Sequence, residues 1–309
     1  MKILVTGGAG FIGSHLVEAL VARGEHVRVL DNLATGHLEN LALVRAQIEF
    51  IQGDLADLET VQAAAAETDV VFHQAALPSV PRSIKNPRAS HDANLTGTLN
   101  VLIAARDRQV QRVVMASSSS VYGNSPALPK VETFEPAPLS PYAVTKLAGE
   151  YYARVFADLY GLSTICLRYF NVFGPRQDPH SQYSGALAKF VQCALHGEPY
   201  PIHGDGEQSR DFTYIENVVR ANLLAASSET DGALVVNVAG GARTTLNQII
   251  ATLNELTQQT LPTQFGPPRA GDVRHSHADI SRARELLGYE PTVQVREGLR
   301  RTVDWYKLS

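Results

Sequence analysis

Residues 5–13 read VTGGAGFIG, and this stretch decides the fold. A short apolar run typical of a β-strand, KILVT, leads into it, and residues 11–24 follow with apolar side chains at helical spacing. Gly7, Gly10 and Gly13 give the spacing G-x-x-G-x-x-G, and Gly8, Gly10 and Gly13 also fit G-x-G-x-x-G. A strand, a glycine turn and a helix in this order indicate a site for a dinucleotide.

The glycine turn is suited to hold a pyrophosphate, because the N-terminus of the next helix offers unpaired N–H groups and a partial positive charge. Asp31 ends the next apolar run, where a carboxylate accepts hydrogen bonds from an adenosine ribose and repels a 2′-phosphate. Because Asn32 follows instead of an arginine, we expect NAD rather than NADP. A surface turn acid is the weaker alternative for Asp31. For Asp54, a turn acid and an adenine contact are about equally supported.

Apolar runs and helical patterns alternate along the chain. Runs typical of strands lie at residues 26–30, 48–54, 69–73, 112–117 and 162–168, and helical patterns at 88–108 and 141–160. Continuously apolar strands separated by helices predict an α/β protein, a Rossmann-type doubly wound parallel sheet. Residues 1–170 would form this cofactor domain. Residues 171–309 would form a smaller α/β C-terminal substrate lobe, with segments near 211–240 as candidates to return to the first domain.

Composition narrows the class of protein. The chain has 309 residues, 44% apolar residues and a net charge of −4, so no broad basic field favours nucleic acid as a partner. No run of 18 apolar residues is present, so we expect no membrane span and a cytoplasmic protein. Cys166 and Cys193 lie in apolar segments without metal-ligand spacing, which favours two buried thiols and no metal site.

A second group of residues points to proton transfer. In SPYAVTK, Ser140 can cap a helix that starts at Pro141, and this places Tyr142 and Lys146 one turn apart on one face. Alone, such a pair more often means packing. A tyrosine has a pKa of about 10, so a base near neutral pH needs a nearby cation such as a lysine ammonium or a nicotinamide ring. The serine run ASSSSVYG at 116–123 ends a predicted strand on the ligand side of the sheet.

These motifs together carry a resemblance that runs nearly from end to end. The sequences VTGGAGFIGSHL, DNL, HQAAL, NLTGTLNVL, SSSSVYG, SPYAVTK, LRYFNVFGPRQ, RDFTYIENV and GDVRHSHADIS resemble the extended short-chain dehydrogenase/reductase superfamily, and more narrowly its nucleotide-sugar 4-epimerases. The resemblance implies Ser118, Tyr142 and Lys146 as the catalytic residues. Related 4,6-dehydratases carry Asp-Glu, or at least Glu, at the positions of Ser119 and Ser120. The two serines therefore favour epimerisation over elimination of water.

The resemblance also implies a bound NAD that is regenerated in each turnover. Tyr142 would take the proton of the sugar 4-hydroxyl with help from Ser118, and the C4 hydride would leave and return to the other face of a 4-keto sugar. Lys146 would bind the nicotinamide ribose. The implied cofactor contacts are Gly7, Gly10, Phe11, Ile12, Gly13, Asp31, Asn32, Asp54, Leu55, Ala75, Ala76, Asn94, Tyr142, Lys146 and Tyr169.

For the substrate, the resemblance implies a UDP-sugar in the C-terminal lobe. Its implied contacts are Ser118, Ser119, Tyr142, Asn171, Arg210, Arg269, Asp272 and Ser276. Arg210 and Arg269 would hold phosphate and uridine ribose, and Asp272 the ribose. Ser276 is small where glucose/galactose-restricted 4-epimerases resemble a tyrosine, so a C2 N-acetyl group would fit. UDP-glucuronate 4-epimerases tend to have threonine at the position of Asn171.

The resulting expectation is a UDP-GlcNAc/UDP-GalNAc 4-epimerase that also accepts UDP-Glc/UDP-Gal. The alternatives are an enzyme restricted to UDP-glucose/galactose, a UDP-glucuronate 4-epimerase, and a catalytically inactive NAD-binding regulatory protein. The last is disfavoured because Ser118, Tyr142 and Lys146 are all present. The resemblance further implies a homodimer that pairs through the helices near 88–108 and 141–160.

Overall fold

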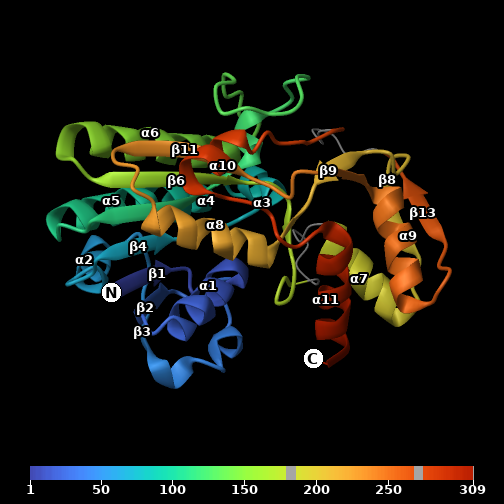
Figure 1. The fold of residues 1–309 in the computed structure, drawn as a ribbon, viewed down its shortest axis with the longest axis horizontal. Helices are drawn as coiled ribbons and strands as arrows, with labels where there is room; N and C mark the ends of the chain where they lie inside the picture. Colours follow the sequence, from blue (N-terminus) through green and yellow to red (C-terminus); the bar gives the residue numbers. More distant parts are fainter. Residues whose placement is uncertain (179–185, 268–273, 309) are drawn as a thin grey trace.

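The centre of the protein is a seven-stranded sheet (Figure 1). The computed structural model describes residues 1–178, 186–267 and 274–308. The strands are all parallel and lie in the order β11-β6-β5-β4-β1-β2-β3. Their bounds are β1 (Lys2–Thr6), β2 (His26–Asp31), β3 (Ile48–Gln52), β4 (Val70–His73), β5 (Arg112–Ser118), β6 (Ser163–Tyr169) and β11 (Ala233–Val238). The predicted Rossmann-type sheet is confirmed, and its strand order reverses between β1 and β4, where such sheets bind their ligands.

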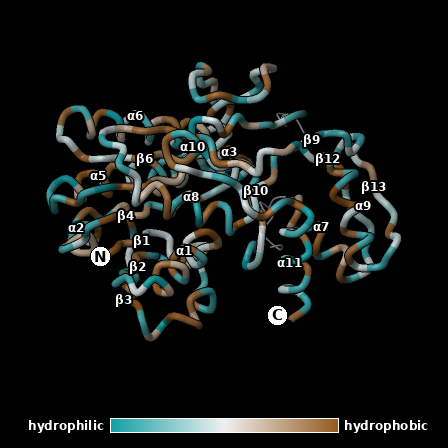
Figure 2. The backbone as a smooth tube through the Cα atoms, viewed as in Figure 1, coloured by the Kyte–Doolittle hydropathy of each residue, from teal (hydrophilic) through white to brown (hydrophobic). Residues whose placement is uncertain are grey.

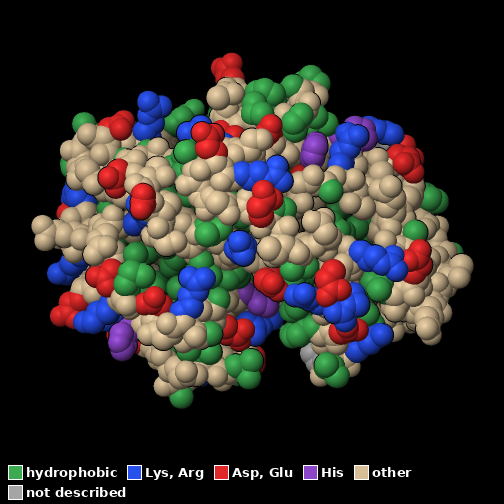
Figure 3. Space-filling view, viewed as in Figure 1, with side chains coloured by type: hydrophobic (Ala, Val, Ile, Leu, Met, Phe, Trp, Pro, Cys, Tyr) green, Lys and Arg blue, Asp and Glu red, His purple; other side chains and the backbone are tan. Residues whose placement is uncertain are grey.

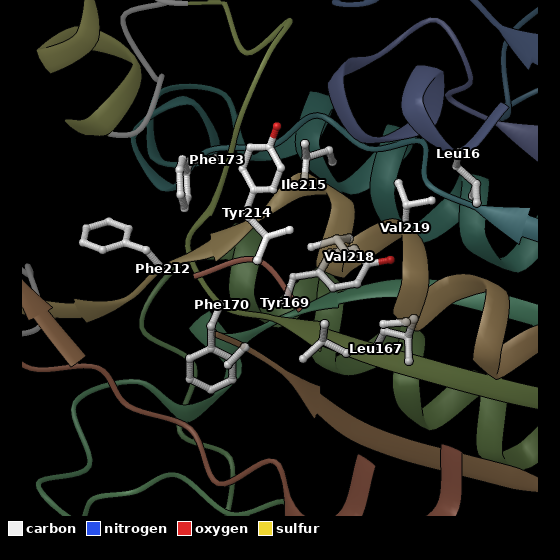
Figure 4. Close-up of a cluster of buried hydrophobic side chains, with 14 of the residues drawn as sticks. Leu16, Leu167, Tyr169, Phe170, Phe173, Phe212, Tyr214, Ile215, Val218 and Val219 are labelled. Carbon is white, nitrogen blue, oxygen red and sulfur yellow. The ribbon is translucent and has the colours of Figure 1, made fainter. Parts of the chain in front are cut away.

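Helices cover both faces of the sheet, which is why its strands are almost continuously apolar (Figure 2). On one face α1 (Phe11–Ala22) packs against α8 (Ile215–Ser227), and on the other α2 (Leu58–Ala64) and α6 (Pro141–Tyr160) flank α5 (Gly97–Asp107). The buried apolar side chains form two clusters. In β1, Ile3 and Val5 belong to one cluster and Leu4 to the other, because successive side chains of a strand point to opposite faces of the sheet. Figure 4 shows part of the cluster that contains Ile3 and Val5, where Leu16, Leu167 and Val219 converge from α1, β6 and α8.

The helical pattern near 88–108 is one continuous helical segment with a wider turn in its middle. Regular helix at α4 (Pro87–His91) passes through a π-helical turn, η3 (Asp92–Thr96), into α5. The shorter helices of this domain are η1 (Leu38–Leu41), η2 (Arg45–Gln47), α3 (Val80–Lys85) and η4 (Ser119–Tyr122). The last follows β5 directly, so the serine run ends the strand as predicted and then turns.

A smaller lobe lies beside the sheet, at the right of Figure 1. It contains α7 (Ala186–His196), β8 (Tyr200–His203), β9 (Ser209–Asp211), β12 (Arg243–Thr245), α9 (Leu246–Thr257), β13 (Thr263–Gly266) and α11 (Val295–Leu308). β8 pairs with β13 and β9 pairs with β12. Between the lobes, β7 (Val172–Phe173) pairs with β10 (Thr213–Tyr214). The chain then returns to the large sheet through α8 and β11, and α10 (Ser281–Leu287) packs beside β11.

The surface carries both signs of charge. Acidic and basic side chains are interspersed over the face seen in Figure 3, with a denser mixture of the two over α11. Arg300 of α11, for example, bonds both Glu297 and Asp304. Within the described ranges, every helix is too short or too polar to cross a lipid bilayer.

Candidate active site

A cavity of about 980 Å³ opens at the carboxyl ends of β1, β2, β4, β5 and β6. It brings together residues that are far apart in the chain, as expected at the switch point of a doubly wound sheet. The sequence-predicted residues that line it are Gly7, Gly10, Phe11, Ile12, Gly13, Asp31, Asn32, Asp54, Leu55, Ala75, Ala76, Ser118, Ser119, Tyr142, Lys146, Tyr169 and Asn171.

The glycine turn between β1 and α1 is built so closely that side chains are excluded. Gly7 has φ +69°, and a Cβ there would lie 2.6 Å from the backbone of Ala75. A Cβ at Gly13 would lie 2.1 Å from the Gly7 carbonyl oxygen, so the first turn of α1 sits directly on the loop. Gly10 caps α1 and lines the cavity. The bare backbone and the helix N-terminus form a cradle that fits a pyrophosphate.

Two acidic residues, Asp31 and Asp54, line the cavity next to the carboxyl ends of β2 and β3. The Asp31 carboxylate accepts hydrogen bonds from the backbone N–H groups of Ala9 (3.0 Å) and Leu33 (2.8 Å). Burial raises the pKa of Asp31, and these two N–H groups oppose that rise. Asn32 donates to Asp54 at 2.9 Å and so orients the second carboxylate. Carboxylates at the ends of β2 and β3 fit the ribose and base of an adenosine, so the cavity suits NAD along this edge.

At the opposite end, α6 delivers the predicted Tyr-Lys pair. The Ser140 hydroxyl accepts from the Ala143 N–H at 3.2 Å and Pro141 occupies the first turn, as predicted from the sequence. Lys146 donates to the Ala116 carbonyl oxygen at 2.8 Å, which ties α6 to the end of β5. This places Tyr142 beside the serine run.

Burial shifts the pKa of both members of the pair. Burial raises the pKa of Tyr142, and the hydrogen bond with the Ser118 hydroxyl opposes this rise. Burial also lowers the pKa of Lys146 to about 8. The predicted effect of the Lys146 ammonium and a nicotinamide ring, which both favour the Tyr142 phenolate, acts in the opposite direction to burial.

The serine run makes its own hydrogen bonds. The Ser118 oxygen accepts from the backbone N–H of Ser120 at 3.2 Å and from the Ser120 hydroxyl at 2.9 Å. Because both groups of Ser120 act as donors, the Ser118 hydroxyl can donate its own proton to an acceptor other than Ser120. Ser119 lines the cavity beside Ser118. Neither residue 119 nor residue 120 supplies a carboxyl group.

Several predicted residues are not among the described residues that line the cavity. Asn94 is buried and binds the backbone of Leu77, accepting from its N–H at 2.7 Å and donating to its carbonyl oxygen, so it supports the cavity wall from behind. Arg210 donates to the carbonyl oxygens of Ser209 and Arg274, and the Ser276 N–H also binds the Ser209 oxygen. These two residues thus sit together on β9 and the segment beside it. Arg269 and Asp272 lie outside the described residues.

Further residues that were not predicted from the sequence also line the cavity. Further lining residues are Thr35, His37, Asn40, Gln74, Leu77, Pro78, Arg82, Asp92, Arg176, Gln177 and Asp178. Arg176 forms an ion pair with Glu18 (2.5 Å) and reaches Ser14 (3.3 Å), so it ties the loop after β7 to α1. Many of these residues follow a strand of the parallel sheet. Because ligands bind at the carboxyl ends of such strands, this position in the sequence could have identified them as cavity-lining residues.

Comparisons with known proteins agree with this geometry. Residues 3–239 match the model of the NAD dependent epimerase/dehydratase family. A UDP-glucose 4-epimerase from Thermotoga maritima, solved with UDP-glucose, is 41% identical, with a TM-score of 0.94 and coverage of 100% of this chain and 99% of that one. A UDP-N-acetylglucosamine 4-epimerase from Methanobrevibacter ruminantium, solved with UDP-N-acetylmuramic acid, is 39% identical, with a TM-score of 0.95 and coverage of 99% and 98%.

A third similar structure contains the cofactor. The Thermus thermophilus UDP-glucose 4-epimerase in complex with NAD is 40% identical, with a TM-score of 0.91 and coverage of 99% of both chains. The chain belongs to the NAD-dependent epimerase/dehydratase family of the short-chain dehydrogenase/reductase superfamily.

Proposed function

We propose that this enzyme is an NAD-dependent UDP-sugar 4-epimerase whose best substrates are UDP-N-acetylglucosamine and UDP-N-acetylgalactosamine. One observation carries the proposal: Ser118, Tyr142 and Lys146 line the same cavity as the glycine turn. A base and a hydroxyl beside a dinucleotide cradle can move the proton of a sugar alcohol, while a bound NAD would accept its hydride and return it to the ketone. UDP-glucose and UDP-galactose are accepted as further substrates.

Tyr142 and Ser118 handle the proton of the sugar 4-hydroxyl. The Tyr142 oxygen accepts that proton, and the Ser118 hydroxyl donates a hydrogen bond to the sugar oxygen as the proton leaves. Lys146 binds the nicotinamide ribose and contributes positive charge near Tyr142. A bound NAD, held by the glycine turn and Asp31, would supply a hydride acceptor and donor for C4 of the sugar and a cationic ring that favours the Tyr142 phenolate. After reduction Tyr142 gives the proton back to the inverted alcohol.

Elimination of water is disfavoured by the side chains after Ser118. Loss of water from a keto sugar requires a carboxylic acid and a base beside the sugar. Ser119 lines the cavity, and Ser120 is occupied by its hydrogen bond to Ser118. A serine hydroxyl does not act as a general acid near neutral pH. Epimerisation therefore accounts for the residues at this end of the cavity better than dehydration.

The sugar preference is proposed from small and polar residues of the substrate side. Ser276 leaves room where a tyrosine would crowd a C2 N-acetyl group. Asn171 lines the cavity, and its amide donates to the Asp211 carbonyl oxygen at 3.0 Å, which orients it for a sugar diphosphate. Arg210, Arg269 and Asp272 bind the UDP portion. The described position of Arg210 beside Ser276 supports a role on one side of this substrate.

We further propose a cytoplasmic homodimer. The outer surface of α6 exposes large apolar side chains, Val144 (50%), Tyr151 (57%), Val155 (45%) and Leu159 (70%), at helical spacing. A row of this kind supports pairing with the same helix of a second copy. Cys166 and Cys193 are free thiols and buried, which suits a reducing compartment.

The test is proton NMR of UDP-N-acetylglucosamine and, separately, UDP-glucose, each mixed with purified protein without added metal. We expect the N-acetylgalactosamine anomeric signal to grow at least as fast as the galactose signal. Turnover of UDP-glucose alone would overturn the N-acetyl preference. A 4-keto-6-deoxy product would contradict the epimerase assignment. Bound NAD without turnover of any UDP-sugar would support the inactive regulatory protein instead. The Tyr142→Phe variant serves as the control for activity from a contaminant.

A further inference from the structure

An ion pair lies buried beneath the proposed catalytic residues. Glu150 of α6 and Arg168 of β6 have side chains only 4% and 5% exposed. Arg168 donates to both carboxylate oxygens of Glu150, through Nε at 2.9 Å and Nη2 at 2.7 Å. Two parallel bonds of this kind hold the carboxylate in a single orientation. A buried pair is weak evidence for stability in itself, so its position calls for another explanation.

The pair touches the strand that carries Ser118. The Ser117 hydroxyl donates to Glu150 Oε1 at 2.5 Å. One residue earlier, the Ala116 carbonyl oxygen accepts from Lys146. Lys146 and Glu150 are one helical turn apart, so consecutive turns of α6 hold consecutive residues of β5. The next residue of β5 is Ser118, and the preceding turn of α6 carries Tyr142.

Arg168 is itself fixed from its other side. Its guanidinium lies 4.7 Å from the centre of the Tyr122 ring, and the Tyr122 hydroxyl donates to Asn237 of β11 at 2.7 Å. The buried Nη1 of Arg168 has no hydrogen-bond partner among the described residues. An arginine that gives up a hydrogen bond and its hydration depends strongly on its carboxylate partner. A change in the orientation of Glu150 would therefore leave the buried Arg168 guanidinium without its carboxylate partner, at a cost in free energy.

We propose that Glu150 and Arg168 are positioning residues, which hold Ser118 and Lys146 in register with Tyr142 for the transfer of the proton. The inference rests on the proposed 4-epimerase function and deepens it. Glu150 and Arg168 are not among the described residues that line the cavity, so the pair acts through Ser117 and through the turn of α6 that separates Glu150 from Lys146.

The charges around Lys146 support this role. The groups that face it from neighbouring elements are Cys166 of β6, His73 of β4 and Glu150 of its own helix. Burial raises the pKa of Cys166 and lowers that of His73 to about 3, so both are neutral near pH 7. Burial lowers the pKa of Lys146, and Cys166 and then Glu150 oppose that shift. Because the Cys166 thiol is neutral near pH 7, Glu150 is the negatively charged one of these two neighbours, and its charge favours the protonated form of Lys146.

The test compares Glu150→Gln, Ser117→Ala and a matched control, Thr164→Val, in the full-length enzyme with NAD. Thr164 lies at the opposite end of β6, and its hydroxyl binds the Ala153 carbonyl oxygen of α6 at 3.1 Å. The control therefore removes a buried bond between the same two elements, away from the cavity. For each protein we would measure kcat and KM for the turned-over UDP-sugar across pH 6–10 and the melting temperature.

For Glu150→Gln we expect the alkaline limb of the kcat profile to move down by about one pH unit, the usual effect of losing one nearby opposite charge. For Ser117→Ala we expect kcat to fall about tenfold, because a small misplacement of Ser118 is costly, with KM and the melting temperature nearly unchanged. Thr164→Val should lower the melting temperature and leave kcat and its pH profile as in the wild type.

The outcomes separate this inference from the proposed function. Wild-type pH profiles and kcat in both site variants, whatever their melting temperatures, would overturn it, and so would an equal loss of kcat in Thr164→Val. If Glu150→Gln does not fold, Ser117→Ala decides. A wild-type enzyme that turns over no UDP-sugar would overturn the proposed function and this inference with it.

Discussion

Replacing Gly13 with alanine should damage both stability and NAD binding. An alanine Cβ at this position would lie 2.1 Å from the Gly7 carbonyl oxygen and 2.8 Å from the Gly7 carbonyl carbon and Gly8 Cα, whereas real Cβ atoms keep at least 3.0 Å from other heavy atoms. All three contacts are backbone atoms, so no flexible side chain can move aside. The glycine turn and the first turn of α1 must separate by nearly an ångström, in the loop that faces the pyrophosphate.

The magnitude follows from two opposing effects. Alanine stabilises a helix by about 1 kcal/mol relative to glycine. Overpacking costs about 1–3 kcal/mol, and a clash with backbone belongs at the upper end. The net loss is about 2 kcal/mol, which lowers the melting temperature of a chain of this length by about 3 °C. Where the bound pyrophosphate holds the turn in its original shape, the complex is more strained than the free variant, and 1.4 kcal/mol of such additional strain weakens NAD binding about tenfold.

Gly149→Ala is the matched control, because it makes the same exchange within a helix where space exists. A Cβ at Gly149 would meet Thr98 and Met115 side-chain atoms at 3.5 and 3.7 Å, which are ordinary contacts. This variant should melt about 1–2 °C above the wild type. Melting would be followed calorimetrically at fixed NAD and protein concentration, and NAD affinity by titration calorimetry of nucleotide-free protein. A Gly13→Ala protein with wild-type melting temperature and NAD affinity would refute the reasoning.

Four further predictions concern the site. Tyr142→Phe should lower kcat about 10³-fold, the typical effect of losing a general base, with KM for the UDP-sugar little changed; NMR turnover rates measure both. Because burial lowers the pKa of Lys146 to about 8, the ammonium loses its proton as the pH rises through that value, and kcat should fall on the alkaline side; a flat profile to pH 10 would contradict this. Asp31→Ala should weaken NAD binding about tenfold by removing charged hydrogen bonds, and calorimetry with NADP should show a smaller preference for NAD. Ser276→Tyr should lower kcat/KM for UDP-N-acetylglucosamine about tenfold relative to UDP-glucose, as measured by competition between the two substrates.

Much of the cavity could be predicted because its motifs are local. The glycine turn needs neighbouring residues only: a strand, glycines whose missing Cβ atoms allow the contact, and a helix that starts at once. The Ser140 cap and the Tyr142–Lys146 spacing likewise follow from positions within one helix. The rule that parallel strands bind ligands at their carboxyl ends then placed Asp31 and Ser118 at the same edge.

Other features depend on which strands become neighbours, which no local pattern specifies. Glu150 looks like an ordinary helix residue and Arg168 like the polar end of an apolar strand, and they meet only because β5 and β6 pair beneath α6. Likewise, Arg176 finds Glu18 across a chain separation that only packing closes. The sequence by itself determined the cofactor cradle and the helix that carries Tyr142 and Lys146 on one face, because short-range sterics and helix periodicity suffice for them, whereas the proposed catalytic roles rest on the resemblance to the family. Tertiary structure alone decided what orients those side chains, because buried charges select partners by proximity in space and not along the chain.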